Sequence, residues 1–322
     1  MNRAALALAL AAACGPALAQ ADSRAKPVPG QAGKQLAAKT PAEPGRLDLA
    51  FGAYQRGLYL TAFQEATKRI ELDASDATAM TLLGELYNQG LGVRQDAAEA
   101  ARWYRLAADR GDAHAMGALG LMAADGRGIS KDPAAARLWF EKAAGLGEAT
   151  AAYNLALLLL ARGSEGDLDT AARLLRIAGE AELGDAQHSL GVLYGRGKGV
   201  RKDPEEAAKL FIRAARNGSL PGEVELAIVL YNGDGIPKDE AQAARLFRRA
   251  ATRGNAIAQN RLARIYVTGR GLPRNLVEAA AWHLVAAGQG LADTWLDAAV
   301  KELPQGDRAR VEQLATERAT GL

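Results

Sequence analysis

The sequence predicts an all-α solenoid of antiparallel helix pairs, and three features that recur at steps of about 36 residues predict it. Pairs of glycines separated by one residue recur along the chain, and an acidic residue or Asn follows each pair after six or seven positions. A bulky residue follows seven positions later. Because the three features keep one phase over six copies, each copy is one structural unit of a stacked array.

Residues 77–111 show how one unit is expected to fold. Leu83 and Leu86 fall on one stripe of a first helix. Gly90 ends that helix, because glycine takes the left-handed cap conformation without strain. Asp96 begins the second helix by accepting hydrogen bonds from its free amide groups. We expect the same capping role of the residues in phase with it, namely Asp132, Asp167, Asp203, Asp239 and Asn275.

The second helices carry the recurring bulky residue, which we expect in the hydrophobic core. The series is Trp103, Trp139, Leu174, Leu210, Leu246 and Trp282. On the first helix, Gly84 marks a point where a neighbouring helix must approach closely.

The pattern Leu83-Gly84-x-x-Tyr87-x-x-Gly90-x-Gly92, followed by Asp96, Trp103-Tyr104 and Gly111, resembles the Sel-one-like repeat. This repeat is a slightly longer relative of the tetratricopeptide repeat. The resemblance covers residues 77–293 as six units. It implies a right-handed α-solenoid that serves as an adaptor for other proteins, of a kind common in bacterial envelopes and secretomes.

The ends and the middle of the array depart from the pattern. Residues 46–76 resemble one tetratricopeptide helix pair that caps the array, and residues 294–322 contain closing helices. Caps are expected because a terminal repeat has no neighbour to cover its apolar face. In the third unit, Ser164-Glu165-Gly166 replaces the glycine pair, and Glu182 stands where a helix-ending glycine belongs. We expect the array to bend or loosen there.

The first 19 residues have the features of a signal peptide. Arg3 precedes an apolar stretch that is too short to span a bilayer, and Ala17-Leu18-Ala19 is a small-x-small cleavage site. The alternative is a lipoprotein acylated at Cys14, although the residues before Cys14 match a lipobox poorly. Either way we expect export, to the periplasm or out of the cell, with a membrane-anchored lipoprotein as the second outcome.

Residues 20–45 contain four prolines and no periodic pattern, which predicts a disordered linker. No segment beyond the leader is apolar enough to span a membrane.

Charge and motif spacing predict a protein without catalytic residues, metal or cofactor. From Arg46 onward, 35 basic and 35 acidic residues balance, so the array lacks the basic stripe that nucleic acid requires. His114, His188 and His283 lie in different units, and no two have metal-ligand spacing. One alternative is an envelope hydrolase acting on cell-wall material, which requires three or more polar groups converging in one pocket. Another is a structural assembly factor for a polysaccharide or secretion machine.

By analogy with tetratricopeptide arrays, five positions of each first helix face a groove that would hold a protein or peptide partner. They are positions two, five, nine, twelve and thirteen, counting the Leu of the pattern as seven. These positions are polar in the first unit and become apolar and aromatic from the third to the fifth. The predicted partner-binding residues are Tyr153, Leu157, Leu160, His188, Val192, Val224, Ile228 and Tyr231.

The competing interpretation is that position nine is partly buried between neighbouring units. It would account for Leu157, Val192 and Ile228, but it does not readily account for Leu160 and Tyr231 at position twelve.

Overall fold

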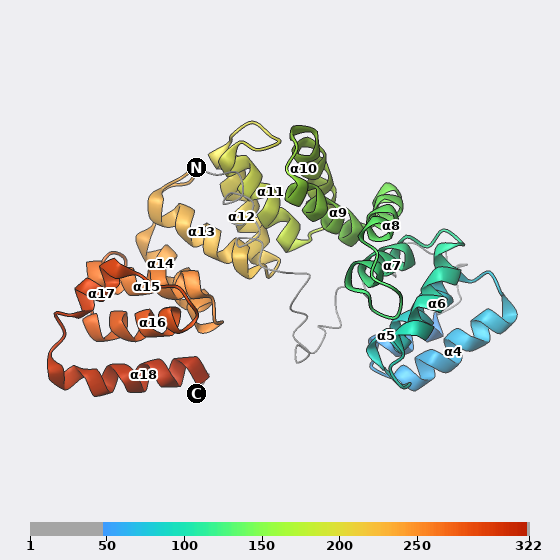
Figure 1. Cartoon of the computed structure of the whole chain (residues 1–322), viewed down its shortest axis with the longest axis horizontal. Coiled ribbons are helices and arrows are strands. Elements are labelled where there is room, and N and C mark those ends of the chain that lie inside the picture. The colour runs from blue at the N-terminus through green and yellow to red at the C-terminus, as the bar shows by residue number, and fades with distance from the viewer. Residues whose placement is uncertain (1–47, 321–322) are drawn as a thin grey trace. The chain divides into compact units, whose positions relative to one another are not determined.

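The computed structural model describes residues 48–320, which form sixteen α-helices, one 3-10 turn and no strand (Figure 1). The predicted all-α repeat class is confirmed. The signal peptide and linker predicted over residues 1–45 lie outside the described residues. The chain divides between Ala178 and Gly179 into two compact units, here called unit 1 and unit 2.

Unit 1 holds the first three repeats and the helix pair before them. Its helices are α3 Leu49–Gln55, α4 Tyr59–Leu72, α5 Ala77–Gln89, α6 Ala97–Ala108, α7 Ala113–Asp125, α8 Pro133–Gly145, α9 Ala149–Arg162 and most of α10 Glu165–Glu180. Helices α3 and α4 pack on each other, and α4 packs on α5. The first helices α5, α7 and α9 contact one another in that order.

Unit 2 holds the last three repeats and the closing helices. Its helices are α11 Gly184–Arg196, α12 Pro204–Arg216, α13 Leu220–Asn232, α14 Glu240–Thr252, α15 Ala256–Thr268, α16 Leu276–Gly288, α17 Thr294–Val300 and α18 Arg308–Thr320. Helix α18 lies along α16 (Figure 1). Val311 of α18 is buried against Ala280 and Ala281, so α18 covers the apolar face of the last repeat.

The second helices begin at the predicted caps, with one exception. Asp96 accepts from the amides of Ala98 and Glu99 at 3.0 Å, and the capping residues of α8, α12, α14 and α16 bind the first turn in the same way. The prediction for Asp167 is wrong, because this residue lies inside α10. Ser164 Oγ accepts from the Asp167 amide at 3.3 Å and donates to its carboxylate at 2.5 Å. Ser164 is therefore the residue that caps α10, three residues before the predicted Asp167.

The first helices have a second series of caps that the repeat pattern did not reveal. The capping residues are Asp76, Asp112, Glu148, Ser219 and Asn255. Only α11 among these helices begins without a side-chain cap, because Leu183 occupies the position. There the Ala186 amide donates instead to the Leu183 carbonyl oxygen at 3.1 Å, so the first turn of α11 has no side-chain acceptor among the described residues.

The aromatic core lies one residue later than predicted. Tyr104, Phe140, Phe211 and Phe247 are at most 4% exposed, whereas Trp103, Trp139, Leu174 and Leu246 are only half-buried. Leu210 and Trp282 are buried, as predicted. The small residue of the first helix decides which neighbour points inward. A Cβ on Gly120 would lie 2.5 Å from the ring of Phe140, so glycine makes room for that ring.

The second glycine of a pair brings neighbouring repeats together at Gly92, Gly128, Gly235 and Gly271. A Cβ on Gly128 would lie 2.1 Å from the carbonyl oxygen of Ala97, and one on Gly235 would lie 2.1 Å from that of Pro204. These loops therefore press on the start of the preceding second helix, an approach that only glycine allows. In the third repeat, Gly166 has no atom within 4 Å of its position for a Cβ. That repeat lacks the loop contact.

Glu182 is the one residue besides glycine in the described range with a positive φ, at 61°. The matching residues in the other repeats are glycines with φ between 80° and 86°. A side chain in the left-handed region costs about 1–2 kcal/mol. This strained turn lies four residues after Ala178, where the two compact units divide.

Candidate functional site

The predicted partner-binding residues are divided between unit 1 and unit 2. In unit 1, Tyr153, Leu157 and Leu160 of α9 are all half-buried. In unit 2, Val192, Ile228 and Tyr231 are half-buried and pack against the core of that unit. The partial burial of position nine agrees with the competing interpretation. Tyr231 at position twelve is partly buried as well, which the competing interpretation did not explain.

Two of the predicted residues are not available to a partner. His188 and Val224 are each 4% exposed and belong to the interior of unit 2. Both occupy position five, which is also buried at Thr81 and Asn260 in other repeats. Position five therefore contributes to packing in these repeats, and assigning it to an exposed groove was wrong for His188 and Val224.

Burial governs the chemistry of His188. Its ring lies 6.2 Å from that of Phe211. Desolvation lowers the pKa of His188 to about 4, because the opposing effect of the Asp185 charge is smaller. The imidazole is therefore neutral at pH 7.

Unit 2 has an open pocket of about 280 Å3 between α13, α15 and α17. Ile228 and Ile265 are its aliphatic lining residues, and Phe247, Tyr231 and Trp295 are its three aromatic ones, of which Phe247 is only 2% exposed. The polar residues that line it are Asn232, Arg261, Arg264 and Thr268. None of its lining residues carries a carboxylate, so the pocket combines aromatic surface with positive charge.

A fixed ion pair positions one side of this pocket. Arg264 donates to the two carboxylate oxygens of Asp293 at 2.7 and 2.9 Å, and its guanidinium lies 5.0 Å from the ring centre of Trp295. Burial alone would raise the pKa of Asp293, but hydrogen bonds from Arg264 and Asn260 outweigh it and lower the pKa to about 2. Asp293 therefore stays ionised and holds Arg264 against Trp295.

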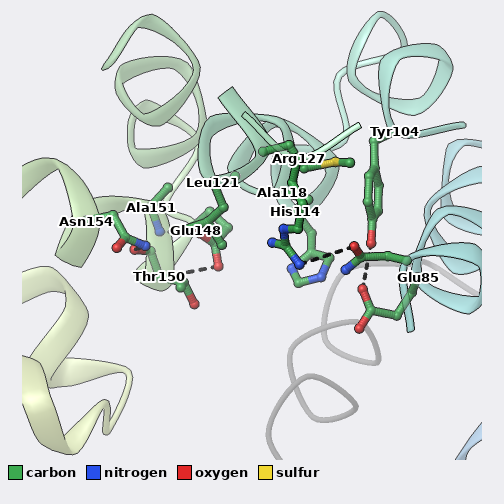
Figure 2. A pocket seen from close by; sticks show the side chains of 13 residues that line it. Glu85, Tyr104, His114, Ala118, Leu121, Arg127, Glu148, Thr150, Ala151 and Asn154 are labelled. Atoms are coloured by element: carbon green, nitrogen blue, oxygen red, sulfur yellow. Dashed lines mark hydrogen bonds between the residues drawn. The ribbon is translucent and has the colours of Figure 1, made fainter. Parts of the chain in front are cut away.

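Unit 1 has a smaller pocket of about 210 Å3, where polar side chains such as Glu85 and His114 stand beside apolar ones such as Ala118 and Leu121 (Figure 2). The Tyr104 hydroxyl donates to Glu85 at 2.6 Å, and Arg127 donates to Asn88 at 3.5 Å. Burial and the neighbouring Glu85 raise the pKa of Tyr104 well above its usual value. On the other side of the pocket, Glu148 caps α9. Both carboxylates of this pocket are therefore engaged in holding the fold.

Both pockets are lined from positions six, nine and twelve of the first helices, with position two added in unit 1 and position thirteen in unit 2. Positions two, six, nine, twelve and thirteen supply most of their residues, and we call this surface the groove face. Position six, which includes Asn154 and Arg261, was missed because the tetratricopeptide analogy omits it. Trp295 was missed because it comes from a closing helix outside the repeat. Only the structure shows that 43% of the Trp295 surface is exposed.

Two kinds of site have no support within residues 48–320. No group of three or more His, Cys, Asp or Glu side chains there is arranged to hold a metal ion. None of the helices in this range combines the length and the apolar character that crossing a membrane requires.

Comparison with known proteins identifies the family of this chain. The chain is a helical-repeat protein, and residues 77–112, 113–148, 149–183, 184–219, 221–255 and 256–291 each match the Sel1 repeat. It belongs to the Sel1 repeat family. The crystal structure of a Sel1 repeat protein from Oxalobacter formigenes is similar, with 32% identity, a TM-score of 0.64 and coverage of 75% of this chain and 97% of that one.

A protective antigen of uropathogenic Escherichia coli that displays an SLR fold is also similar. It is 26% identical, with a TM-score of 0.55, and the match covers 82% of this chain and 64% of that one. No curated protein matches the chain significantly.

Proposed function

We propose that this protein is an exported scaffold, in the periplasm or outside the cell, that holds a protein or peptide partner on its groove face and catalyses no reaction. The observation that carries the proposal is the pocket of unit 2, where Tyr231 and Trp295 border an apolar surface that the fold leaves open. Aromatic side chains at such places are enriched among residues that dominate binding energy. The leader, with its cleavage site after Ala19, supports export.

Site-specific cross-linking tests the scaffold function. A photoreactive amino acid replaces Tyr231 in one variant and Arg245, an exposed residue of the second helix α14, in a control. Both proteins are expressed in the native host and irradiated, and cross-linked partners are identified by mass spectrometry. We expect one defined partner from position 231 and none from position 245. Equal cross-linking at both positions contradicts a specific groove face.

A binding measurement with that partner gives the energetic test. Tyr231→Ala removes an aromatic contact and should weaken partner binding by about 1–3 kcal/mol. Leu160→Ser tests the groove face of unit 1 in the same assay. Calorimetry with the purified partner measures both effects, and wild-type affinity in both variants would contradict the assigned surface.

Export is tested separately. Mass spectrometry of the mature amino terminus should find Gln20 as the first residue. A diacylated terminus at Cys14 would instead make the protein a lipoprotein, and an uncleaved chain would contradict export by this leader.

The titratable side chains at the unit 1 pocket bear on the hydrolase alternative. Glu85, His114 and Glu148 all line it, although Glu85 binds Tyr104 and Glu148 caps α9. A hydrolase needs a carboxylate that is free to transfer a proton or attack substrate. We expect no release of soluble fragments from purified cell-wall material. Release that Glu85→Gln abolishes, at an unchanged melting temperature, would favour the hydrolase.

A further inference from the structure

We propose that the unit 2 pocket binds a peptide segment in which an aromatic side chain stands next to an acidic residue. This inference rests on the proposed scaffold function and names the chemistry of the segment that the pocket would select. It is carried by the size of the pocket, by its aromatic residues and by one exposed arginine, Arg261, that makes no hydrogen bond or ion pair within residues 48–320.

The size of the pocket favours a single side chain as the anchor. Its volume of about 280 Å3 lies just below the ~300–1,000 Å3 of pockets that enclose whole small molecules. Ile228, Phe247 and Ile265 offer apolar surface to such an anchor. Tyr231 and Trp295 can contact its ring edge to face or in an offset stack, which favours an aromatic anchor over an aliphatic one.

One side of the pocket is also preorganised before a ligand binds. Asp293 fixes Arg264 with two hydrogen bonds, and Arg264 lies against the ring of Trp295. The ring is thereby held while 43% of its residue surface stays exposed. A fixed aromatic residue loses little conformational entropy when a ligand packs on it.

Arg261 supplies the charge complementarity. Its side chain is exposed and makes no hydrogen bond or ion pair with any residue in the range 48–320. Its neighbour Arg264, by contrast, is neutralised by Asp293. Burial raises the pKa of Glu225, and the charges of Arg196 and Arg261 oppose that rise, so Arg261 shares this carboxylate with a second arginine. An acidic side chain next to the aromatic anchor would give Arg261 the partner that the fold does not provide.

The test uses four labelled peptides that differ only in a central pair of residues between flanking glycines. The pairs are Phe-Asp, Phe-Asn, Ala-Asp and Phe-Lys, and binding to the purified protein is followed by fluorescence polarisation. We expect saturable binding of the Phe-Asp peptide, about tenfold weaker binding of the Phe-Asn peptide, and little binding of the Ala-Asp peptide.

Variants of the protein assign these preferences to residues. Arg261→Gln should bind the Phe-Asp and Phe-Asn peptides equally, because the charge that distinguishes them is gone. Arg261→Glu should prefer the Phe-Lys peptide. Trp295→Ala should weaken all the Phe peptides about tenfold. Arg245→Gln removes another exposed, unpaired arginine of unit 2 and should change nothing.

Three results would overturn the inference: no saturable binding of the Phe-Asp peptide, equal binding of the Phe-Asp and Phe-Asn peptides by the wild type, or retained discrimination in Arg261→Gln. Melting curves of each variant exclude loss of fold as the cause. If the peptides fail while Tyr231 still cross-links to one partner, the peptide inference falls and the scaffold function stands. If cross-linking at position 231 also fails, both fall.

Discussion

The groove faces of the two units share helix positions six, nine and twelve, but some of those positions carry side chains of different chemistry. Position nine is Glu85 in the first repeat and Arg264 in the sixth. Around the unit 1 pocket, Glu85 and Glu148 are used by the fold, the first by Tyr104 and the second as a helix cap. At the unit 2 pocket, and within the described part of the chain, Arg261 makes no comparable hydrogen bond that holds the fold. The repeat therefore fixes where the groove face lies, and residues that the repeat does not need decide what it can bind.

The largest expected effect separates the groove face from the core of unit 1. Phe140→Ala should lower the free energy of unfolding by about 3–5 kcal/mol, because it empties a site that is 1% exposed. Leu160→Ser should cost far less, since Leu160 is only half-buried. Denaturant unfolding of both variants measures the difference. If Leu160→Ser is as damaging as Phe140→Ala, Leu160 is core and the groove interpretation fails in unit 1.

The next prediction is that the stabilities of the two units depend differently on pH. The pKa of His188 falls from 6.5 to about 4 on folding, so between these values the unfolded chain binds a proton that the folded chain does not. The contribution of His188 to the free energy of unfolding is fully present above pH 6.5. Acidification to pH 4 should lower the free energy of unfolding of unit 2 by about 3 kcal/mol. Thr81, at the same position in the first repeat, does not titrate.

Hydrogen exchange at pH 7 and pH 4.5 measures this difference separately for each unit. The loss of protection should be larger in unit 2, and His188→Leu should reduce it. Equal losses in both units with His188 present would show that this residue does not set the acid sensitivity.

A smaller effect tests the two ways in which second helices begin. Asp203→Ala removes the cap of α12 in unit 2 and should cost about 1 kcal/mol. Asp167→Ala in unit 1 should cost less, because Ser164 still caps α10 through its hydroxyl. Thermal unfolding measures both. Partner affinity should be unchanged by Asp203→Ala, and a tenfold loss at unchanged stability would show that this carboxylate contacts the partner.

The smallest effect is a gain in stability where the two units divide. Glu182→Gly should raise the free energy of unfolding by about 0.5–1 kcal/mol, because the relieved left-handed strain exceeds the added entropy of the unfolded chain. Glu180→Gly, two residues earlier in α10, is the matched control and should lower stability. In the wild type, hydrogen exchange should be faster over residues 162–185 than in the flanking repeats. Uniform protection across the array would contradict a weak junction.

The regular part of the fold could be predicted because local chemistry specifies it. Asp96 accepts from amides within its own first turn, and Gly90 takes a left-handed φ of 69° at the end of its own helix. Such interactions join residues close in sequence, so spacing alone reveals them. The departure at Glu182 was visible for the same reason, since a glycine was expected there and is missing.

What only the tertiary structure decided was which side chains meet across helices. Trp103 and Tyr104 are adjacent and both bulky, yet Tyr104 is buried because its ring fills the space above Gly84 on the partner helix. Position five turned inward at His188, whose buried ring lies 6.2 Å from that of Phe211 on the paired second helix. The unit 2 pocket joins Tyr231 to Trp295, which lies 64 residues further along the chain. A contact of that kind depends on how helices stack, and helical periodicity within one segment contains no information about it.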